Sequence, residues 1–172
     1  MHLTKTYSAA LVASLLTAAP AIAAAVSAPV APPARALLLI PLTLTKVQDL
    51  HFGSVIPSGL PGTVTIDAAT GNRTGSPEVS LIPSDAGQKG YFAGAGSPNQ
   101  QVIMALTPAT ILTDGLGNNI TVASMSLDGP NTRTIDPVDH TFFVGVGGVL
   151  NIDADQPEGV YTATYNLTAD YQ

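Results

Sequence analysis

Strict two-residue alternation near the C-terminus, over residues 160–171, is the feature that most constrains the fold. One parity carries the apolar and aromatic side chains Tyr161, Ala163, Tyr165, Leu167, Ala169 and Tyr171. The other parity is mainly Thr, Asn and Asp. A period of two residues is typical of a β-strand with one buried and one solvated face. We therefore predict a single strand over residues 160–171, long enough to be a central structural element.

The rest of the chain has the composition of an all-β domain. The full sequence contains 14 Val, 10 Ile and 19 Thr, and Gly or Pro separates the short apolar runs. Runs of this kind favour an antiparallel sandwich or barrel, and no helical period of useful length is present. We predict further strands at residues 36–46, 49–56, 63–67, 78–82, 90–95, 100–106, 111–113, 120–127, 141–146 and 148–153.

The first 25 residues have the order of a secretory signal peptide. A start with Lys5 and no acidic residue precedes an apolar run, which Pro20 ends before a series of small residues. The run is shorter than the roughly 20 residues that a membrane span needs. We expect cleavage between residues 23 and 28, followed by export of a chain without a membrane span.

Two parts are expected after the cleavage site. Residues 26–36 are rich in Ala and Pro and are typical of an extended leader. Residues 37–172 have the length of one domain, and we expect a single β-sandwich there. Pro41 has no N–H to donate, so the strand at 36–46 should lie at a sheet edge or carry a break.

Charge is scarce in this chain. Only 10% of the residues are charged, with six Lys or Arg and a net charge of −6. So few basic residues do not provide the positive surface that nucleic acid requires. The predicted strands are nearly free of charge, and strand edges without charged residues tend to pair with other strands. This pattern favours a protein that associates with its own copies.

Little in the sequence supports catalysis or metal binding. The absence of Cys excludes disulfides and thiolate metal sites. His51 lies in a predicted strand and His140 in a predicted turn, and neither has a partner residue in its sequence context. No G-x-S-x-G motif occurs, and the glycines of residues 145–148 do not precede a helix. We therefore expect no enzyme activity, no cofactor and no metal ion.

Four segments and the end of the chain carry a family resemblance. The segments are LHFGSVIP at 50–57, GTVTI at 62–66, VGVGGVL at 144–150 and QPEGVYT at 156–162. They resemble a family of exported bacterial domains of unknown function that is similar to spore-coat-U-type domains and to chaperone–usher pilins. Pilins typically end with a Gly, an alternating strand and a penultimate Tyr, and Gly159 and Tyr171 match those positions.

The resemblance implies an immunoglobulin-like sandwich that lacks one strand, with the gap filled by a neighbour's N-terminal extension. Part of residues 26–45 would then be donated, with Leu38, Ile40, Leu42 and Leu44 filling the neighbour's groove. Residues 160–171, together with Gly159, would border that groove and pair with an assembly chaperone. The implied function is a structural subunit of an extracellular fibre or surface coat. Its partners would be copies of itself, a periplasmic chaperone and an outer-membrane usher, and it would pass through the periplasm to the cell surface.

Two alternatives stay open. In the first alternative, residues 36–45 are not donated and form the first strand of the domain itself. In the second alternative, the protein is not a structural subunit but a secreted monomeric module that binds a carbohydrate or another surface ligand through exposed aromatic side chains. The supply of such side chains is small, because Trp is absent and three Tyr lie on the apolar parity of the last strand.

Overall fold

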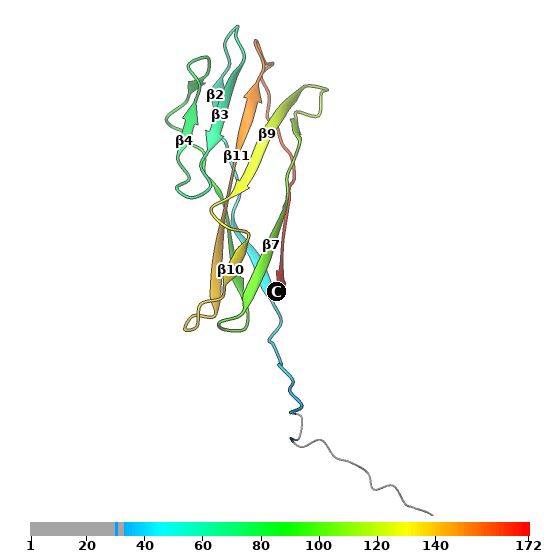
Figure 1. Ribbon diagram of the computed structural model, residues 1–172. Coiled ribbons are helices and arrows are strands. Elements are labelled where there is room, and N and C mark those ends of the chain that lie inside the picture. Colours follow the sequence, from blue (N-terminus) through cyan, green and yellow to red (C-terminus); the bar gives the residue numbers. More distant parts are fainter. Residues whose placement is uncertain (1–29, 31–32) are drawn as a thin grey trace, which may run out of the picture. The chain divides into compact units, whose positions relative to one another are not determined.

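The computed structural model describes Val30 and residues 33–172 (Figure 1). The predicted signal peptide, residues 1–25, and most of the leader, residues 26–36, lie outside the described residues. The chain divides into a compact unit, Leu38–Gln172, and a preceding part, Met1–Leu37. The described residues contain no helix, and hence none long and apolar enough to cross a membrane.

Antiparallel strands make up the described structure, which confirms the predicted all-β sandwich class. The strands are β1 (Thr43–Gln48), β2 (Val55–Ile56), β3 (Gly62–Ile66), β4 (Arg73–Gly75), β5 (Ser80–Leu81), β6 (Gly90–Ala95), β7 (Gln101–Thr107), β8 (Ile111–Thr113), β9 (Asn119–Leu127), β10 (Thr132–Thr134), β11 (Thr141–Ile152) and β12 (Asn166–Tyr171).

The long strand β11 connects the two halves of the domain. Its residues 141–146 pair with β6, its residues 148–152 pair with β3, and its residues 146–151 pair with β9. The resulting seven-stranded sheet has the order β1-β6-β11-β3-β4, with β9 joined to β11 and β8 joined to β9. A three-stranded sheet, β10-β7-β12, packs on its lower half in Figure 1, and the pair β2-β5 lies in the upper half.

Glycines allow β11 to be continuous. We predicted two strands here, at residues 141–146 and 148–153, and that prediction was wrong. A Cβ atom added at Gly147 would collide with the backbone of Ile66, and one added at Gly145 would collide with the backbone of Ala68. These glycines therefore permit a close approach of the chain around residues 66–68 instead of forming a turn.

The apolar core consists of two clusters. The lower cluster contains Val102, Met104, Ile135, Phe142, Val144, Val146 and Leu167, contributed by both the seven-stranded and the three-stranded sheet. The upper cluster contains Val64, Val79, Ile120, Leu150 and Ile152, mainly from the seven-stranded sheet. Among the described residues, Phe52, Val55, Leu81 and Tyr161 pack on this cluster from outside that sheet, whereas Leu112 and Val122 pack on it from β8 and β9 of the same sheet. The lower half is thus a closed two-layer sandwich, whereas the upper half has one complete layer.

The C-terminal strand is shorter than the sequence predicts. β12 begins at Asn166, pairs only with β7 and lies at the end of its sheet. The preceding residues 160–165 are paired only through a single bridge between Thr162 and Thr113. The prediction of a long central strand was therefore wrong, because within the described residues β8 pairs with this segment only through its last residue, Thr113. The alternation of burial is nevertheless present, with Leu167 buried and Thr168 exposed.

The strand β1 lies at the end of the seven-stranded sheet and begins shortly after Pro41, as the missing N–H of that residue predicted. Leu42 and Leu44 pack against the lower cluster of their own domain. Leu38 and Ile40, by contrast, are 87% and 51% exposed. Of the two interpretations that the sequence left open, the structure therefore places residues from Leu42 onwards in the domain itself.

A hydrogen-bonded clasp ties the start of this segment to the end of the chain. The Tyr171 hydroxyl accepts a hydrogen bond from the Ser97 N–H at 2.7 Å and donates one to the Ile40 carbonyl at 2.8 Å. The Ile40 N–H in turn donates to the Ser97 hydroxyl at 2.9 Å. Because Ser97 is buried, the two bonds that involve it satisfy an N–H and a hydroxyl that water does not reach freely, whereas the bond to the Ile40 carbonyl is exposed.

Replacing Tyr171 by Phe should lower the free energy of unfolding by about 1–3 kcal/mol, because the clasp loses its central hydroxyl and leaves the Ser97 N–H without a partner. Urea denaturation of the wild-type and variant proteins measures this difference. The matched control is Tyr91→Phe, since the Tyr91 hydroxyl makes no hydrogen bond within the described residues. Equal unfolding midpoints for the two variants would contradict a stabilising clasp.

Candidate binding groove

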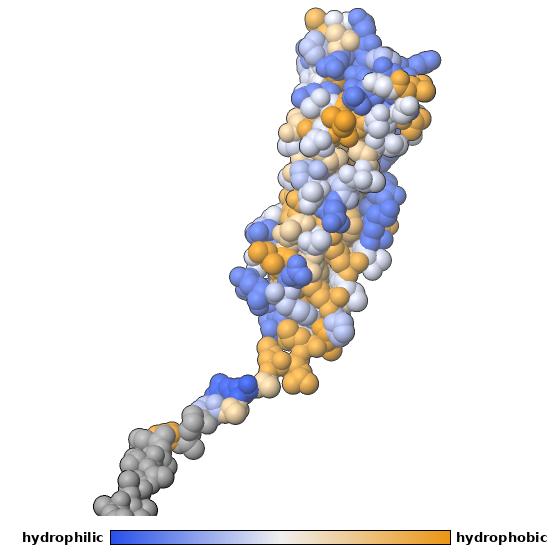
Figure 2. Space-filling model, turned by 90° about the vertical axis from the view of Figure 1, so that its right-hand side faces the viewer, coloured by the Kyte–Doolittle hydropathy of each residue, from blue (hydrophilic) through white to orange (hydrophobic). Residues whose placement is uncertain are grey.

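An apolar groove of about 740 Å³ lies over the upper cluster, and we call it the upper groove. Its floor contains Leu112, Ile120, Val122, Leu150 and Ile152 from β8, β9 and β11. One wall is formed by residues 50–57, which include β2, and the other by residues 156–165, which precede β12. The groove therefore lies where the second layer of the sandwich is incomplete. Figure 2 shows apolar side chains at the surface on the side of the domain that carries β7, β9 and β12.

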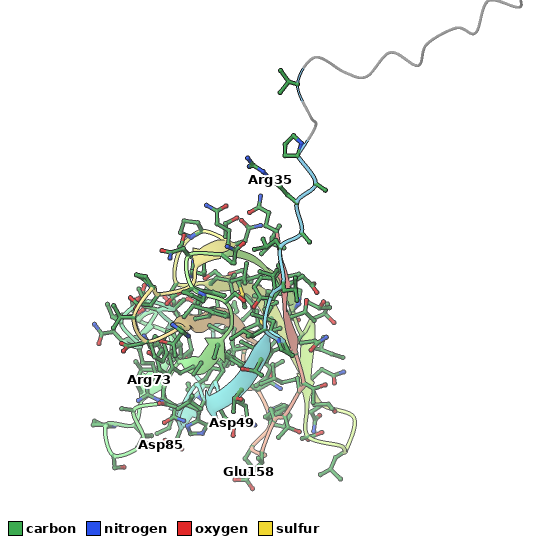
Figure 3. The ribbon with its side chains drawn as sticks, turned by 90° about the horizontal axis from the view of Figure 1, so that it is seen from below. Arg35, Asp49, Arg73, Asp85 and Glu158 are labelled. Atoms are coloured by element: carbon green, nitrogen blue, oxygen red, sulfur yellow. The ribbon has the colours of Figure 1, made fainter. Side chains whose placement is uncertain are left out.

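Few charged groups line this groove. His51, Asp85 and Glu158 are the ionisable lining residues apart from two tyrosines. In Figure 3, Asp85 and Glu158 lie at the periphery of the domain. An apolar floor with charge only at its margins suits an apolar segment of polypeptide better than an ionic ligand.

The groove also contains a buried phenol without a partner. The Tyr165 hydroxyl is inaccessible to solvent and has no hydrogen-bond partner within the described residues. Its ring packs edge-on against Phe92, with the ring centroids 6.2 Å apart. Burial raises the pKa of this hydroxyl above its ordinary value. Leaving such a group unpaired costs about 1–3 kcal/mol.

One wall of the groove has a free backbone edge. In β12 and the preceding residues 160–165, the even-numbered residues direct their N–H and C=O groups toward β7 and β8. Two hydrogen bonds demonstrate this, from the Gln172 N–H to the Gln101 carbonyl (3.0 Å) and from the Thr162 N–H to the Thr113 carbonyl (2.9 Å). Backbone groups alternate in direction along an extended chain, so those of Tyr161, Ala163 and Tyr165 are directed away from β7. They have no hydrogen-bond partner within the described residues.

Arg73 holds the opposite wall in place. Its guanidinium donates to the carbonyls of Phe52 at 3.1 Å, Ser54 at 3.1 Å and Ile82 at 2.7 Å. Gly53 sits between the first two carbonyls with φ +74°, and a side chain there would collide with Arg73 and with the backbone of Asp85. This wall is therefore fixed by a dense polar network (Figure 3).

Asp85 completes that network. It accepts a hydrogen bond from the Ser54 hydroxyl at 2.7 Å, and His51 Nδ1 lies 3.5 Å from its other oxygen. The bond from Ser54 is the main reason why the pKa of Asp85 is below its ordinary value, with further contributions from the charges of His51 and Arg73. His51 therefore lies beside a carboxylate, but the Ser54 hydroxyl donates to Asp85 and not to the imidazole, so no activated serine results.

The structure brings together some of the residues that the sequence singled out and separates others. Of the predicted groove strand, Gly159, Tyr161, Ala163 and Tyr165 line the upper groove. Leu167 belongs to the lower cluster, and Ala169 and Tyr171 pack against it, as Tyr165 also does. Of the predicted donor residues, Leu38 and Ile40 are exposed, and Leu42 and Leu44 belong to the domain's own core.

Sequence reasoning missed the floor and the second wall of the groove. Residues 50–57 were expected to form part of a strand, and nothing in their pattern places them opposite residues 156–165. The approach of these segments depends on contacts between residues that are about a hundred positions apart in sequence, which local periodicity does not report. The apolar residues of the segment 120–127 indicated that one face of this segment is buried, but not which residues lie opposite it.

The chain belongs to the family described as "Domain of unknown function (DUF4402)", which matches residues 42–171. This family match confirms the expected membership of a domain family of unknown function. It covers β1 through β12, including both walls of the upper groove. No curated protein and no solved structure matched the chain.

The pH dependence of stability should change when Asp85 is replaced by Asn. Because the folded-state pKa of Asp85 is lowered, its charge contributes stability above the ordinary carboxyl pKa of about 4, and this contribution is lost as the pH falls through the lowered value. The difference in unfolding free energy between wild type and Asp85→Asn should therefore be present near neutral pH and vanish in acid. Urea titrations over a pH series measure it.

The control for this series is Asp153→Asn, since the Asp153 carboxyl is exposed and makes no hydrogen bond within the described part of the chain. A constant difference between wild type and Asp85→Asn at every pH would contradict the role assigned to the Asp85 charge.

Proposed function

We propose that this protein is a structural subunit of an extracellular fibre or surface coat, assembled by strand addition between copies. The observation that carries the proposal is the upper groove, where an apolar floor lies beside an unpaired backbone edge. An added strand would use both features at once, since its backbone pairs with the edge and its alternate side chains cover the floor. In this proposal the domain is an immunoglobulin-like sandwich that lacks one strand.

The occupant that we propose is the N-terminal segment of a second copy. Leu37, Leu38 and Leu39 are consecutive and exposed, and Pro41 separates them from β1. Each Leu that becomes buried contributes roughly 1.5–3 kcal/mol before the cost of ordering the chain. Leu42 and Leu44 are not available for donation, because they pack in the core of their own domain. The donated segment therefore ends before the clasp at Ile40.

Export and assembly follow from the same proposal. The predicted signal peptide would direct the chain to the periplasm, where a free strand edge beside an apolar groove needs protection from premature pairing. A periplasmic chaperone that pairs with the edge at residues 160–171 would give that protection, and an outer-membrane usher would exchange it for the next subunit. The final location is then the cell surface.

Removal of the donor side chains should abolish assembly and leave the folded domain intact. We expect the mature chain, residues 26–172, to form oligomers at high concentration, and the triple variant Leu37→Ser, Leu38→Ser, Leu39→Ser to remain monomeric with an unchanged unfolding midpoint. Light scattering after size-exclusion chromatography measures the mass. The matched control replaces Leu116 and Val138 by Ser, since both are exposed apolar residues of loops. A monomeric wild type would contradict the proposal.

Obstruction of the groove should have the complementary effect. Ala163 is exposed and lines the groove, so Ala163→Arg should fold normally and yet accept no strand. Ala123→Arg is the matched control, because Ala123 is also exposed but does not line the groove. Mixing Ala163→Arg, which keeps its donor segment, with the triple Leu variant, which keeps its groove, should give a complex of two chains and no larger species. Absence of that complex would exclude donation by residues 37–39.

A second function is favoured by one observation. Tyr91 and Phe143 stack in parallel, with ring centroids 5.7 Å apart, and Phe143 is 50% exposed. Lys89 Nζ lies 5.4 Å from the centroid of the Tyr91 ring. Aromatic side chains are enriched at binding surfaces, so this pair supports the alternative of a carbohydrate-binding module.

If this platform binds sugars, Phe143→Ala should lower the affinity for a glycan by tenfold or more, since the open ring face is lost, with little change in stability because Phe143 lies on the outer face of β11. Glycan-array screening followed by calorimetry tests this prediction, with Ile103→Ala, at an exposed apolar position of β7, as a control. A wild-type protein that binds no glycan would exclude the carbohydrate-binding function.

A further inference from the structure

We propose that residues 160–165 become a regular strand when the upper groove accepts a strand from a second copy, so that β12 then extends from Val160 to Tyr171. This inference rests on the proposed function and adds a conformational step to it. The shape of the groove then changes on binding, because the wall at residues 160–165 becomes a regular strand when the groove is occupied.

The first observation is that the sequence pattern of a strand continues beyond the observed strand. The two-residue alternation begins at Val160, whereas β12 begins only at Asn166. The apolar parity continues on the groove side, with Tyr161 and Tyr165 partly buried and Thr162 and Thr164 exposed. Apart from the exposed Ala163 and the bridge at Thr162, the residues before Asn166 therefore have the side-chain distribution of a strand without its hydrogen bonds.

The second observation is that the backbone of this segment is already extended. No turn or bend interrupts the chain between Val160 and Tyr165, and the bridge at Thr162 has the same phase as the ladder between β12 and β7. The segment and β12 thus share one line of backbone groups. The change that we propose requires new hydrogen bonds and no reversal of the chain direction.

The third observation identifies the edge from which the new hydrogen bonds must come. On the side of β7, the neighbouring strand ends at Thr107, and the next residue is Pro108, which has no N–H to donate. The ladder cannot be prolonged on that side beyond the single bridge to Thr113. On the other side, the backbone groups of Tyr161, Ala163 and Tyr165 have no partner within the described residues.

The extent of the step is limited at its upper end. The Tyr161 hydroxyl donates to the Pro157 carbonyl at 2.8 Å and accepts a hydrogen bond from the Gln156 side chain at 2.9 Å. These bonds hold Tyr161 to residues 156–157, where the chain turns back from β11. The amides that gain protection are therefore those of Tyr161, Ala163 and Tyr165, whereas the Thr162 amide is already bonded.

Amide hydrogen exchange of the two-chain complex tests the inference. The triple Leu variant, labelled with ¹⁵N and carrying an unobstructed groove, is measured alone and after addition of the unlabelled Ala163→Arg chain. We expect the amides of Ala163 and Tyr165 to exchange at least a hundredfold more slowly in the complex, as ladder amides do. The Thr168 amide, which already bonds β7, serves as an internal reference and should change little.

The outcomes separate this inference from the proposed function. A complex that forms while the Ala163 and Tyr165 amides exchange as before would overturn the inference and leave donation between copies intact. Failure of the two chains to associate would overturn both. Amides that are already protected in the free chain would also overturn the inference, since the strand would then exist without an added partner.

A pair of proline variants gives an independent measurement. Each is made in the triple Leu background and titrated with the Ala163→Arg chain. Ala163→Pro removes an N–H that faces the added strand and should weaken association by tenfold or more. Thr164→Pro removes an N–H that faces the β7 side, and Thr164 does not line the groove. The affinity of this variant for the Ala163→Arg chain should therefore stay within about twofold of that of the triple Leu variant. Equal weakening by both variants would contradict the assigned edge.

Discussion

The pairing of β11 along its whole length is the constraint on which the rest of the structure depends. Three other strands, β3, β6 and β9, form ladders with it, and its apolar residues belong to both clusters of the core. Two glycines make this continuity possible, because any side chain at Gly145 or Gly147 would collide with the chain around residues 66–68. The strand β11 therefore forms part of both the closed lower half and the incomplete upper half of the domain.

The lower and upper halves of the domain differ in how completely the apolar residues of β11 are covered. In the lower half, β7 and β12 cover the apolar residues of β11, and the clasp at Tyr171 closes the end of the chain. In the upper half the corresponding layer is interrupted, so that apolar side chains and a free backbone edge remain together. If the protein assembles as proposed, stability and association would therefore depend on different residues.

Local patterns predicted much of the fold and little of the groove. The bounds of β6 and β8 agree with the sequence interpretation, because Gly and Pro punctuate these segments clearly. The alternation before Asn166 predicted the partial burial of Tyr161 and Tyr165, but neither the exposure of Ala163 nor the hydrogen bonding, since pairing depends on a neighbour that the pattern does not contain. Gly147 was misread as a break, because close packing and turns favour the same residue. The wall at residues 50–57 was missed, because only the tertiary fold places it there.

The clasp has a mechanical consequence. If the segment before Ile40 lies in a neighbouring subunit, a pull along a fibre enters this domain at Ile40, where the Tyr171 hydroxyl and Ser97 hold the backbone. The force then passes to β1 and to β12, which lie at the ends of two different sheets. Residues 43–48 of β1 pair antiparallel with β6, so the load acts along the strand and must shear several hydrogen bonds together instead of opening them singly.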